Sequence, residues 1–422
     1  MKFLSFCISF ACVLNCTILV NRSLAEEMLL PSEFLTEVSL KSWNSESQTF
    51  TWSLPAEERS LSPLDTETFL CWGKPRPFTR GQACLVLNSG SIFVGTLGIF
   101  HDEKVVLSTE FLGVLEFPYE NVAGILLPSV VGVAPCDRLL WELETRNFPQ
   151  DTLILRDGSR LEGMFEIIEE NRAIFDTDEA SPWREKRWTP QLSEVFALAF
   201  SSRLRASVEK QTAGTRYFRL GLADGSLFSM NLSDPEWAEK MNQIPIEGIS
   251  YIESPPQSMK YINPELTAAT EAAKQVRWLD AVPPSHFEYA SVLGKSGFSW
   301  NYGRNRSATG APLQTNGNLY PHGLGVLPGM SLKWKLDGNF RKLVVFPAID
   351  DGNLPGTSAV FRILTDGKPR AEIEVHRGET PSCCWIDVSE VKEIQLVTVS
   401  SPDSSAMQPP VRGSWLRGVL IP

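Results

Sequence analysis

Histidine is scarce in this sequence, because only four of the 422 residues are histidines and they lie far apart. The patterns G-x-S-x-G, H-E-x-x-H and D-x-D-x-D-G, which mark serine hydrolases, zinc proteases and calcium loops, are missing. Gly-Lys-Ser at 294–296 lacks the upstream glycine of a phosphate-binding loop, since Tyr289 stands there. These absences predict a protein that is not an enzyme and that has no catalytic residue, metal or cofactor.

Cysteine pairs at metal-site spacing are also lacking. Three of the eight cysteines lie in the first 25 residues, and the other five are Cys71, Cys84, Cys136, Cys383 and Cys384. An odd number with no C-x-x-C pair argues against a zinc site. For Cys71 and Cys84 two alternatives stay open: a disulfide formed in an oxidising compartment, or two buried free thiols.

Long apolar runs are absent after residue 20. The one run, from Phe3 to Val20, follows Lys2 and precedes a Ser-Leu-Ala cleavage pattern at 23–25. This order is typical of a secretory signal peptide, so residues 1–25 are expected to be removed and the protein exported to the periplasm or the cell exterior. The alternative is an uncleaved membrane anchor, since the run is close to spanning length.

Positive charge is in short supply in the first part of the chain. Without residues 1–25 the chain has 37 basic and 50 acidic residues, a net charge of −13. Residues 26–284 carry −15 and residues 285–422 carry +2. A nucleic-acid surface needs clustered positive charge, so nucleic acid is not an expected partner.

Sustained helical periodicity is rare, whereas glycine and proline (29 each) and tryptophan (12) are frequent. This composition favours short strands joined by turns. Three segments share an apolar pair, a turn ending in Gly-Ser and a second apolar run: LVLNSGSIFVG (85–95), LILRDGSRLEG (153–163) and LGLADGSLFSM (220–230). Gly90, Gly158 and Gly225 are expected at equivalent hairpin turns, because glycine accepts the positive φ of such turns.

A proline-led apolar strand follows each hairpin, and Pro118, Pro190 and Pro245 are expected to mark where these strands begin. The pattern resembles Sm-like barrels, in which a short curved sheet closes on itself. The expected divisions are a strand-rich segment (26–80), three β repeats (81–145, 146–205 and 206–253), a linker with one helix around 265–278 (254–277), and a final domain (278–422).

The final domain contains ATGAPLQTNGNLYPHGLGVLPGMSLKWKLDGNFRKLVVFPAIDD at 308–351, followed by a strand–DGK hairpin at 358–370 and strands at 388–400 and 414–421. These residues resemble the NPCBM/NEW2 domain, a family described as a carbohydrate-binding module beside glycoside hydrolases. Leu327, Ala348 and the lack of an acid before Trp415 depart from the family pattern. From the residues alone, short alternating strands separated by Gly/Asp turns predict two packed antiparallel sheets.

The predicted fold class is therefore all-β: small bent β-barrel-like repeats, then an antiparallel β-sandwich of the galactose-binding-like jelly-roll type. The proline-rich linker contains few apolar residues, so residues 278–422 are expected to fold alone. Trp334 is in phase with Leu332 and Leu336 and is expected in the core, as is Trp415.

Sugars stack on aromatic rings and are oriented by polar groups. The candidate carbohydrate-binding residues are Trp300, Tyr302, Tyr320, His322 and Trp385, of which the four aromatic residues lie in turn-like context and are expected to be exposed. His322 has no second ligand at metal spacing, which favours a structural role, and it is a candidate because it lies beside Tyr320.

The resemblance implies a secreted, non-catalytic protein that binds glycan or another cell-surface polymer. One alternative is a module that binds other surface proteins, and a second is an enzyme associated with glycoside hydrolysis. Membrane contact is expected only if the N-terminal segment is not cleaved.

Overall fold

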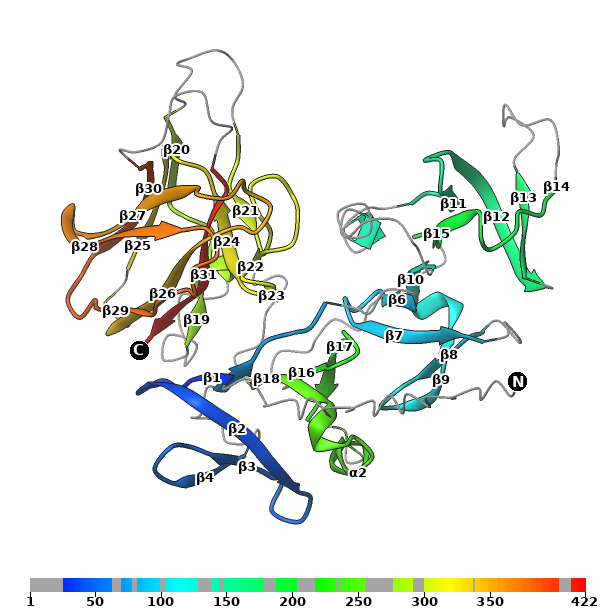
Figure 1. Cartoon of the computed structure of the whole chain (residues 1–422), viewed down its shortest axis with the longest axis horizontal. Helices are drawn as coiled ribbons and strands as arrows, with labels where there is room; N and C mark the ends of the chain where they lie inside the picture. Colours follow the sequence, from blue (N-terminus) through cyan, green and yellow to red (C-terminus); the bar gives the residue numbers. More distant parts are fainter. Residues whose placement is uncertain are drawn as a thin grey trace, which may run out of the picture.

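The computed structural model describes most of the chain in strands and turns (Figure 1). The described residues are 26–62, 70–77, 82–98, 104–127, 139–140, 142–143, 148–169, 171–177, 187–202, 217–232, 234, 237–254, 276–290, 300–336, 338–401 and 411–422. The predicted signal peptide, Cys136 and most of the predicted linker helix lie outside these residues. No described helix is long and apolar enough to cross a membrane.

The first part of the chain consists of four successive groups of strands. The N-terminal unit contains β1 (Glu26–Leu29), β2 (Phe34–Asn44), β3 (Thr49–Ser53), β4 (Glu58–Leu61) and β5 (Leu70–Gly73). The first repeat contains β6 (Ala83–Leu87), β7 (Ile92–Leu97), β8 (Lys104–Thr109), β9 (Gly113–Pro118), the 3₁₀ turn η1 (Tyr119–Asn121) and β10 (Val122–Leu126). The second contains β11 (Asp151–Leu155), β12 (Arg160–Glu169), β13 (Arg172–Thr177), β14 (Arg187–Trp188) and β15 (Val195–Ala199). The third contains β16 (Tyr217–Leu222), β17 (Leu227–Asn231), α2 (Trp237–Asn242), η2 (Ile246–Gly248) and β18 (Ile249–Ser254).

The same pairing order recurs in all four groups. The first strand of each group pairs antiparallel with the second strand and with the last: β1 with β2 and β5, β6 with β7 and β10, β11 with β12 and β15, and β16 with β17 and β18. We call β5, β10, β15 and β18 the closing strands. The described strands form no closed barrel; instead the closing strands pair with one another, β10 with β15 and β18 with β5.

The three glycine turns are equivalent, as the sequence predicts. Gly90, Gly158 and Gly225 have φ of 81°, 90° and 98°. Each glycine donates its backbone N–H to the carbonyl three residues before it, at 2.9–3.1 Å. In each turn the carbonyl oxygen of the serine after the glycine accepts a hydrogen bond from the backbone N–H of the leucine that ends the first strand (Leu87, Leu155 and Leu222).

The prolines mark a different point from the one expected. Pro118 and Pro245 each precede a 3₁₀ turn, and the closing strands begin only after it, at Val122 and Ile249. Pro190 likewise precedes a turn, in which the Glu194 N–H bonds the Gln191 carbonyl. Proline fixes φ near −65°, which suits entry into a turn and explains this position.

The N-terminal unit is a repeat that the sequence did not reveal. Its hairpin turns at Leu30–Glu33 through paired backbone bonds and contains no glycine. The Gly-Ser signature that identified the other three is therefore missing, although the strand order is the same.

The final domain is an antiparallel sandwich of two sheets. One sheet has the order β21-β24-β31-β26-β29, with β19 added to β31, and the other has the order β20-β25-β30-β27-β28. The strands of the first are β19 (Arg277–Trp278), β21 (Gly303–Arg304), β24 (Gly323–Val326), β26 (Lys342–Ile349), β29 (Cys384–Asp387) and β31 (Gly413–Ile421). Those of the second are β20 (His286–Tyr289), β25 (Met330–Lys335), β27 (Ser358–Thr365), β28 (Lys368–His376) and β30 (Glu393–Ser400). The turn η5 (Leu279–Ala281) follows β19, and β22 (Gln314–Thr315) pairs with β23 (Asn318–Leu319).

The space between the two sheets is a packed apolar core. Trp334 and Trp415, predicted to be core residues, are buried, and the Trp415 ring meets Phe361 edge-on at 4.9 Å. The all-β sandwich predicted from alternating strands is thus confirmed.

The outer face of the β31–β26 sheet is buried as well, because the first part of the chain packs against it. Val344, Phe346 and Val419 of the sandwich share one apolar cluster with Leu29 and Tyr251 of the first part. Across this contact Phe34 meets Phe346, with ring centroids 5.2 Å apart. The first part of the chain and the sandwich therefore share buried surface, a contact that the sequence analysis did not predict.

Cys71 and Cys84 are buried, form no disulfide with each other and lie in different apolar clusters. The second alternative for this pair, two buried thiols, is the one that the structure contains.

Candidate functional site

The five candidate residues lie in three separate places. Tyr320 and His322 face the first part of the chain, Trp300 and Tyr302 pack against the sandwich core, and Trp385 lies in the edge strand β29. Trp385 is also partly buried against the apolar cluster that contains Tyr320, and the five residues do not meet in one site.

Tyr320 and His322 are both buried, which for Tyr320 is contrary to expectation. Their exposed fractions are 4% and 1%, because the N-terminal unit and β18 cover the corner that contains them. No carbohydrate reaches these side chains in this arrangement, so we do not place them in a binding site.

His322 joins the two parts of the chain through a buried ionic cluster. Its Nδ1–H donates to Asp280 Oδ2 at 2.9 Å, and its Nε2–H donates to both carboxylate oxygens of Glu253 at 3.1 Å. Tyr251 donates its hydroxyl to Glu253 at 2.6 Å. The imidazole stacks on Trp278 with 4.0 Å between ring centroids and 2° between planes.

The charges in this cluster stabilise one another. Burial alone would lower the pKa of His322, but the carboxylates of Glu253 and Asp280 outweigh it and raise the pKa to about 9. Burial alone would raise the pKa of Glu253, but His322 and the Tyr251 hydroxyl bring it down to about 2. At neutral pH the cluster is an imidazolium between carboxylates; both ring nitrogens are occupied and the ring is buried, so it serves as a structural clamp.

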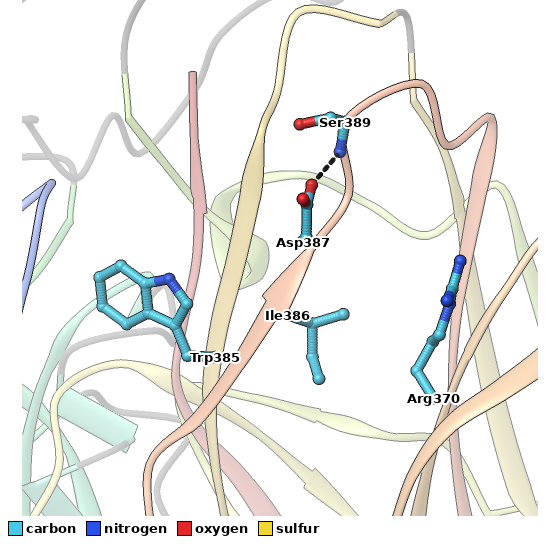
Figure 2. Close-up of a pocket in the computed structure, with 5 residues that line it drawn as sticks. All are labelled: Arg370, Trp385, Ile386, Asp387 and Ser389. Atoms are coloured by element: carbon cyan, nitrogen blue, oxygen red, sulfur yellow. Dashed lines mark hydrogen bonds between the residues drawn. The ribbon is translucent and has the colours of Figure 1, made fainter.

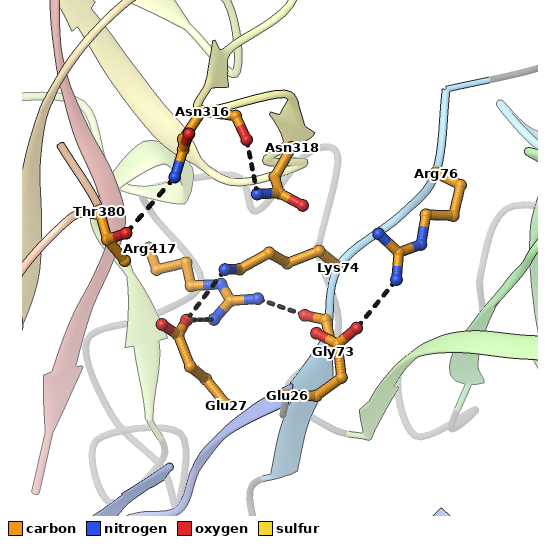
Figure 3. Close-up of polar contacts among 9 residues, drawn as sticks. All are labelled: Glu26, Glu27, Gly73, Lys74, Arg76, Asn316, Asn318, Thr380 and Arg417. Atoms are coloured by element: carbon orange, nitrogen blue, oxygen red, sulfur yellow. Dashed lines mark hydrogen bonds and ion pairs between the residues drawn. The ribbon is translucent and has the colours of Figure 1, made fainter. Parts of the chain in front are cut away.

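A second polar cluster lies beside it, drawn in Figure 3. Arg417 is buried, pairs with Glu27 at 3.3 Å and donates to the carbonyl oxygen of Gly73. Lys74 pairs with the same Glu27 oxygen at 3.4 Å. The two cations lie 5.4 and 5.6 Å from the centroid of the Tyr320 ring, so the buried ring contacts both of them.

Trp300 and Tyr302 are half-buried at the sandwich core. The Tyr302 ring meets Phe287 edge-on at 5.3 Å, and burial raises the pKa of its hydroxyl. Both residues contribute mainly to packing, and their contact with carbohydrate stays a prediction.

Trp385 lines a surface hollow (Figure 2). The hollow measures about 330 Å³ and is lined by Arg370, Trp385, Ile386, Asp387 and Ser389. In Figure 2 the indole projects from one side of β29, and Ile386 and Arg370 lie on the other side. β29 pairs only with β26 among the described strands, so its outer edge is open.

The polar groups of the hollow are held in place by short contacts. Asp387 accepts a bond from the backbone N–H of Ser389 at 2.8 Å, which lowers the pKa of the carboxyl and fixes the turn after β29. The Nε–H of Arg370 donates to Thr365 Oγ1 at 2.8 Å. Lys342 places its ammonium 5.0 Å from the centroid of the Trp385 ring.

The hollow therefore combines an indole, one cation, one carboxylate and a hydroxyl, and the Lys342 ammonium lies beside the indole. This set suits binding of a ring-shaped polar molecule, because the ring face offers apolar contact and the charged groups offer hydrogen bonds. Sequence reasoning identified Trp385 but missed Arg370 and Asp387. Asp387 had a local signal, since an Asp two residues before a Ser at a strand end is typical of an Asx turn.

Comparison with known proteins gave matches to solved structures and to one family model. No curated protein matched the chain. A CBM51 module from Clostridium perfringens GH95, in complex with methyl-galactose, has 14% identity over 35% of this chain and 99% of that chain, with a TM-score of 0.29. The CBM51-2 and INT domains of Clostridium perfringens ZmpB have 17% identity over 35% of this chain and 31% of that chain, with a TM-score of 0.29.

The M60 catalytic domain of ZmpB with its CBM51-1 and CBM51-2 domains has 9% identity over 94% of this chain and 51% of that chain, with a TM-score of 0.24. The family match covers the sandwich, from β19 into β31, the region that carries the quoted motifs. Residues 276–417 of this chain thus match the NPCBM/NEW2 domain family.

Proposed function

We propose that this protein binds carbohydrate through its sandwich and catalyses no reaction. The observation that carries the proposal is the match of residues 276–417 to the NPCBM/NEW2 family. This is the family that the sequence analysis describes as a carbohydrate-binding module. The hollow at β29 supplies a site within the matched residues, and Trp385 is the aromatic platform for the sugar ring.

The non-catalytic part of the proposal is supported by the composition of the hollow. Glycoside hydrolysis uses two carboxyl groups that face one bond. Asp387 is the one carboxylate among the residues that line the hollow, and it already accepts a backbone bond. This set is suited to holding a sugar rather than cleaving it.

Export to the periplasm or the cell exterior is part of the same proposal, on the strength of the signal-like residues 1–25. The expected partner is a carbohydrate or another cell-surface polymer. Contact with a membrane follows only if those residues are retained, and the net charge of −15 over residues 26–284 argues against nucleic acid.

A second candidate function, binding of other surface proteins, is favoured by one observation. The sandwich already uses one sheet face to bind a protein surface, that of the N-terminal unit and β18. The remaining surface would then contact another protein in the same manner, without affinity for sugar.

A glycan array probed with the full chain separates these functions. We expect binding to at least one class of glycan, with the bound glycan intact by mass spectrometry afterwards. An array without any bound glycan would favour the protein-binding function, and shortened glycans would show that the chain is an enzyme.

A further inference from the structure

Two basic side chains, Arg370 and Lys342, lie near β29. Some surface cations of this protein are neutralised by direct contact: Arg362 pairs with Glu372 at 2.8 Å, and Arg187 with Glu166 at 2.7 Å. Arg370 and Lys342 form no ion pair with any residue in the described part of the chain. Arg370 is exposed and Lys342 is half-buried.

Their position makes them available to a ligand. The Nε–H bond to Thr365 orients the Arg370 guanidinium and leaves its two terminal nitrogens without an ion pair, and Arg370 lines the hollow. A guanidinium in this state matches the paired oxygens of a carboxylate or sulfate group. Lys342 lies over the indole, so an anion beside a stacked sugar ring meets a second cation there.

Asp387 is the one acid among the residues that line the hollow, and a single carboxylate does not neutralise both Arg370 and Lys342. Asp387 lies opposite Lys342 in the strand pairing, and its bonded partner is the Ser389 backbone. Two basic groups, Arg370 and Lys342, thus lie in or beside the hollow with one acidic group, Asp387. This local balance contrasts with the −15 of residues 26–284, which would repel an acidic ligand elsewhere on the protein.

Resting on the proposed function, we propose that the hollow at β29 selects an acidic saccharide, one that carries a carboxylate or sulfate group, through Arg370 and Lys342. The ligand is an oligosaccharide rather than a single sugar, because the indole and the guanidinium lie on opposite sides of the edge strand (Figure 2). One ring stacks on Trp385 while the acidic group of a neighbouring ring pairs with Arg370. The open backbone edge of β29 bonds hydroxyl groups between them.

Matched pairs of polysaccharides test this selectivity with the full chain. Affinity electrophoresis compares polygalacturonate with its methyl ester, and dextran sulfate with dextran, which separates carboxylate from sulfate recognition. We expect one acidic polymer to bind at least about tenfold more tightly than its neutral partner. Arg370→Gln and Lys342→Gln should each weaken that binding by about fivefold to tenfold, and Arg362→Gln is the matched control, with the same change in charge and no expected effect.

The outcomes separate this inference from the function on which it rests. Equal binding of acidic and neutral polymers that still requires Trp385 would overturn acid selectivity and keep carbohydrate binding. Unchanged binding of both polymers to Arg370→Gln would also overturn acid selectivity and keep carbohydrate binding. Equally tight binding of polyglutamate would show attraction to any polyanion and overturn the inference, whereas no binding of any saccharide would overturn the proposed function itself.

Discussion

Replacing His322 with leucine is expected to lower the free energy of unfolding by about 3–5 kcal/mol. The substitution removes the cation that lies 2.9 Å from Asp280 and 3.1 Å from Glu253, and it leaves two buried carboxylates facing an apolar side chain. An uncompensated buried charge must take up a proton or admit water, and both cost stability. Urea denaturation followed by tryptophan fluorescence measures the change, with the exposed His376→Leu as a control expected within about 0.5 kcal/mol.

The same clamp should give the protein an alkaline loss of stability. The pKa of His322 is raised to about 9 in the folded chain, above its ordinary value of 6.5. A raised pKa contributes stability that is complete below pH 6.5 and is lost as the pH rises through about 9. The free energy of unfolding of the wild type should therefore decrease between pH 6.5 and about 9, and it should decrease less in His322→Leu. Parallel pH dependence in the two proteins would contradict an ionised clamp.

The isolated sandwich, residues 276–422, is expected to lose its solubility or its fixed packing when separated from the first part of the chain. Separation exposes Val344, Phe346 and Val419 on the outer sheet face. Each apolar side chain of this size contributes about 1.5–3 kcal/mol when buried, so their joint exposure is large against a typical domain stability. It also removes Glu253 from His322 and Glu27 from Arg417.

Binding of the dye ANS and the sedimentation of the fragment report this exposure. A fragment carrying Val344→Thr and Phe346→Thr is the matched comparison, and it should bind less dye and stay monomeric. A wild-type fragment that is monomeric, binds no dye and unfolds cooperatively would contradict the account of a shared core.

The parts of the fold that the sequence predicted are those with local signals. Gly90, Gly158 and Gly225 marked their turns because only glycine accepts the positive φ there without cost. The alternation in Met330–Lys335 placed Trp334 inside, since a strand with one buried face has a period of two.

The contact between the first part of the chain and the sandwich has only an indirect signal in the sequence. The strands Lys342–Ile349 and Gly413–Ile421 are nearly continuous runs of buried residues rather than alternating ones. Such runs indicate a strand covered on both faces, but they do not say what covers the second face. The partners of His322, at Asp280 and Glu253, lie 42 and 69 residues away and meet it only through tertiary packing.

Isothermal titration of the best array glycan against the wild type and Trp385→Ala is the most direct test of carbohydrate binding at β29. We expect the variant to lose about 1–3 kcal/mol of binding, by analogy with other planar ligands stacked on aromatic rings. Trp300→Ala, at the other candidate tryptophan, should lose less affinity than Trp385→Ala, because its indole packs on the sandwich core. Wild-type affinity in Trp385→Ala would contradict the account and move the binding site away from the edge strand.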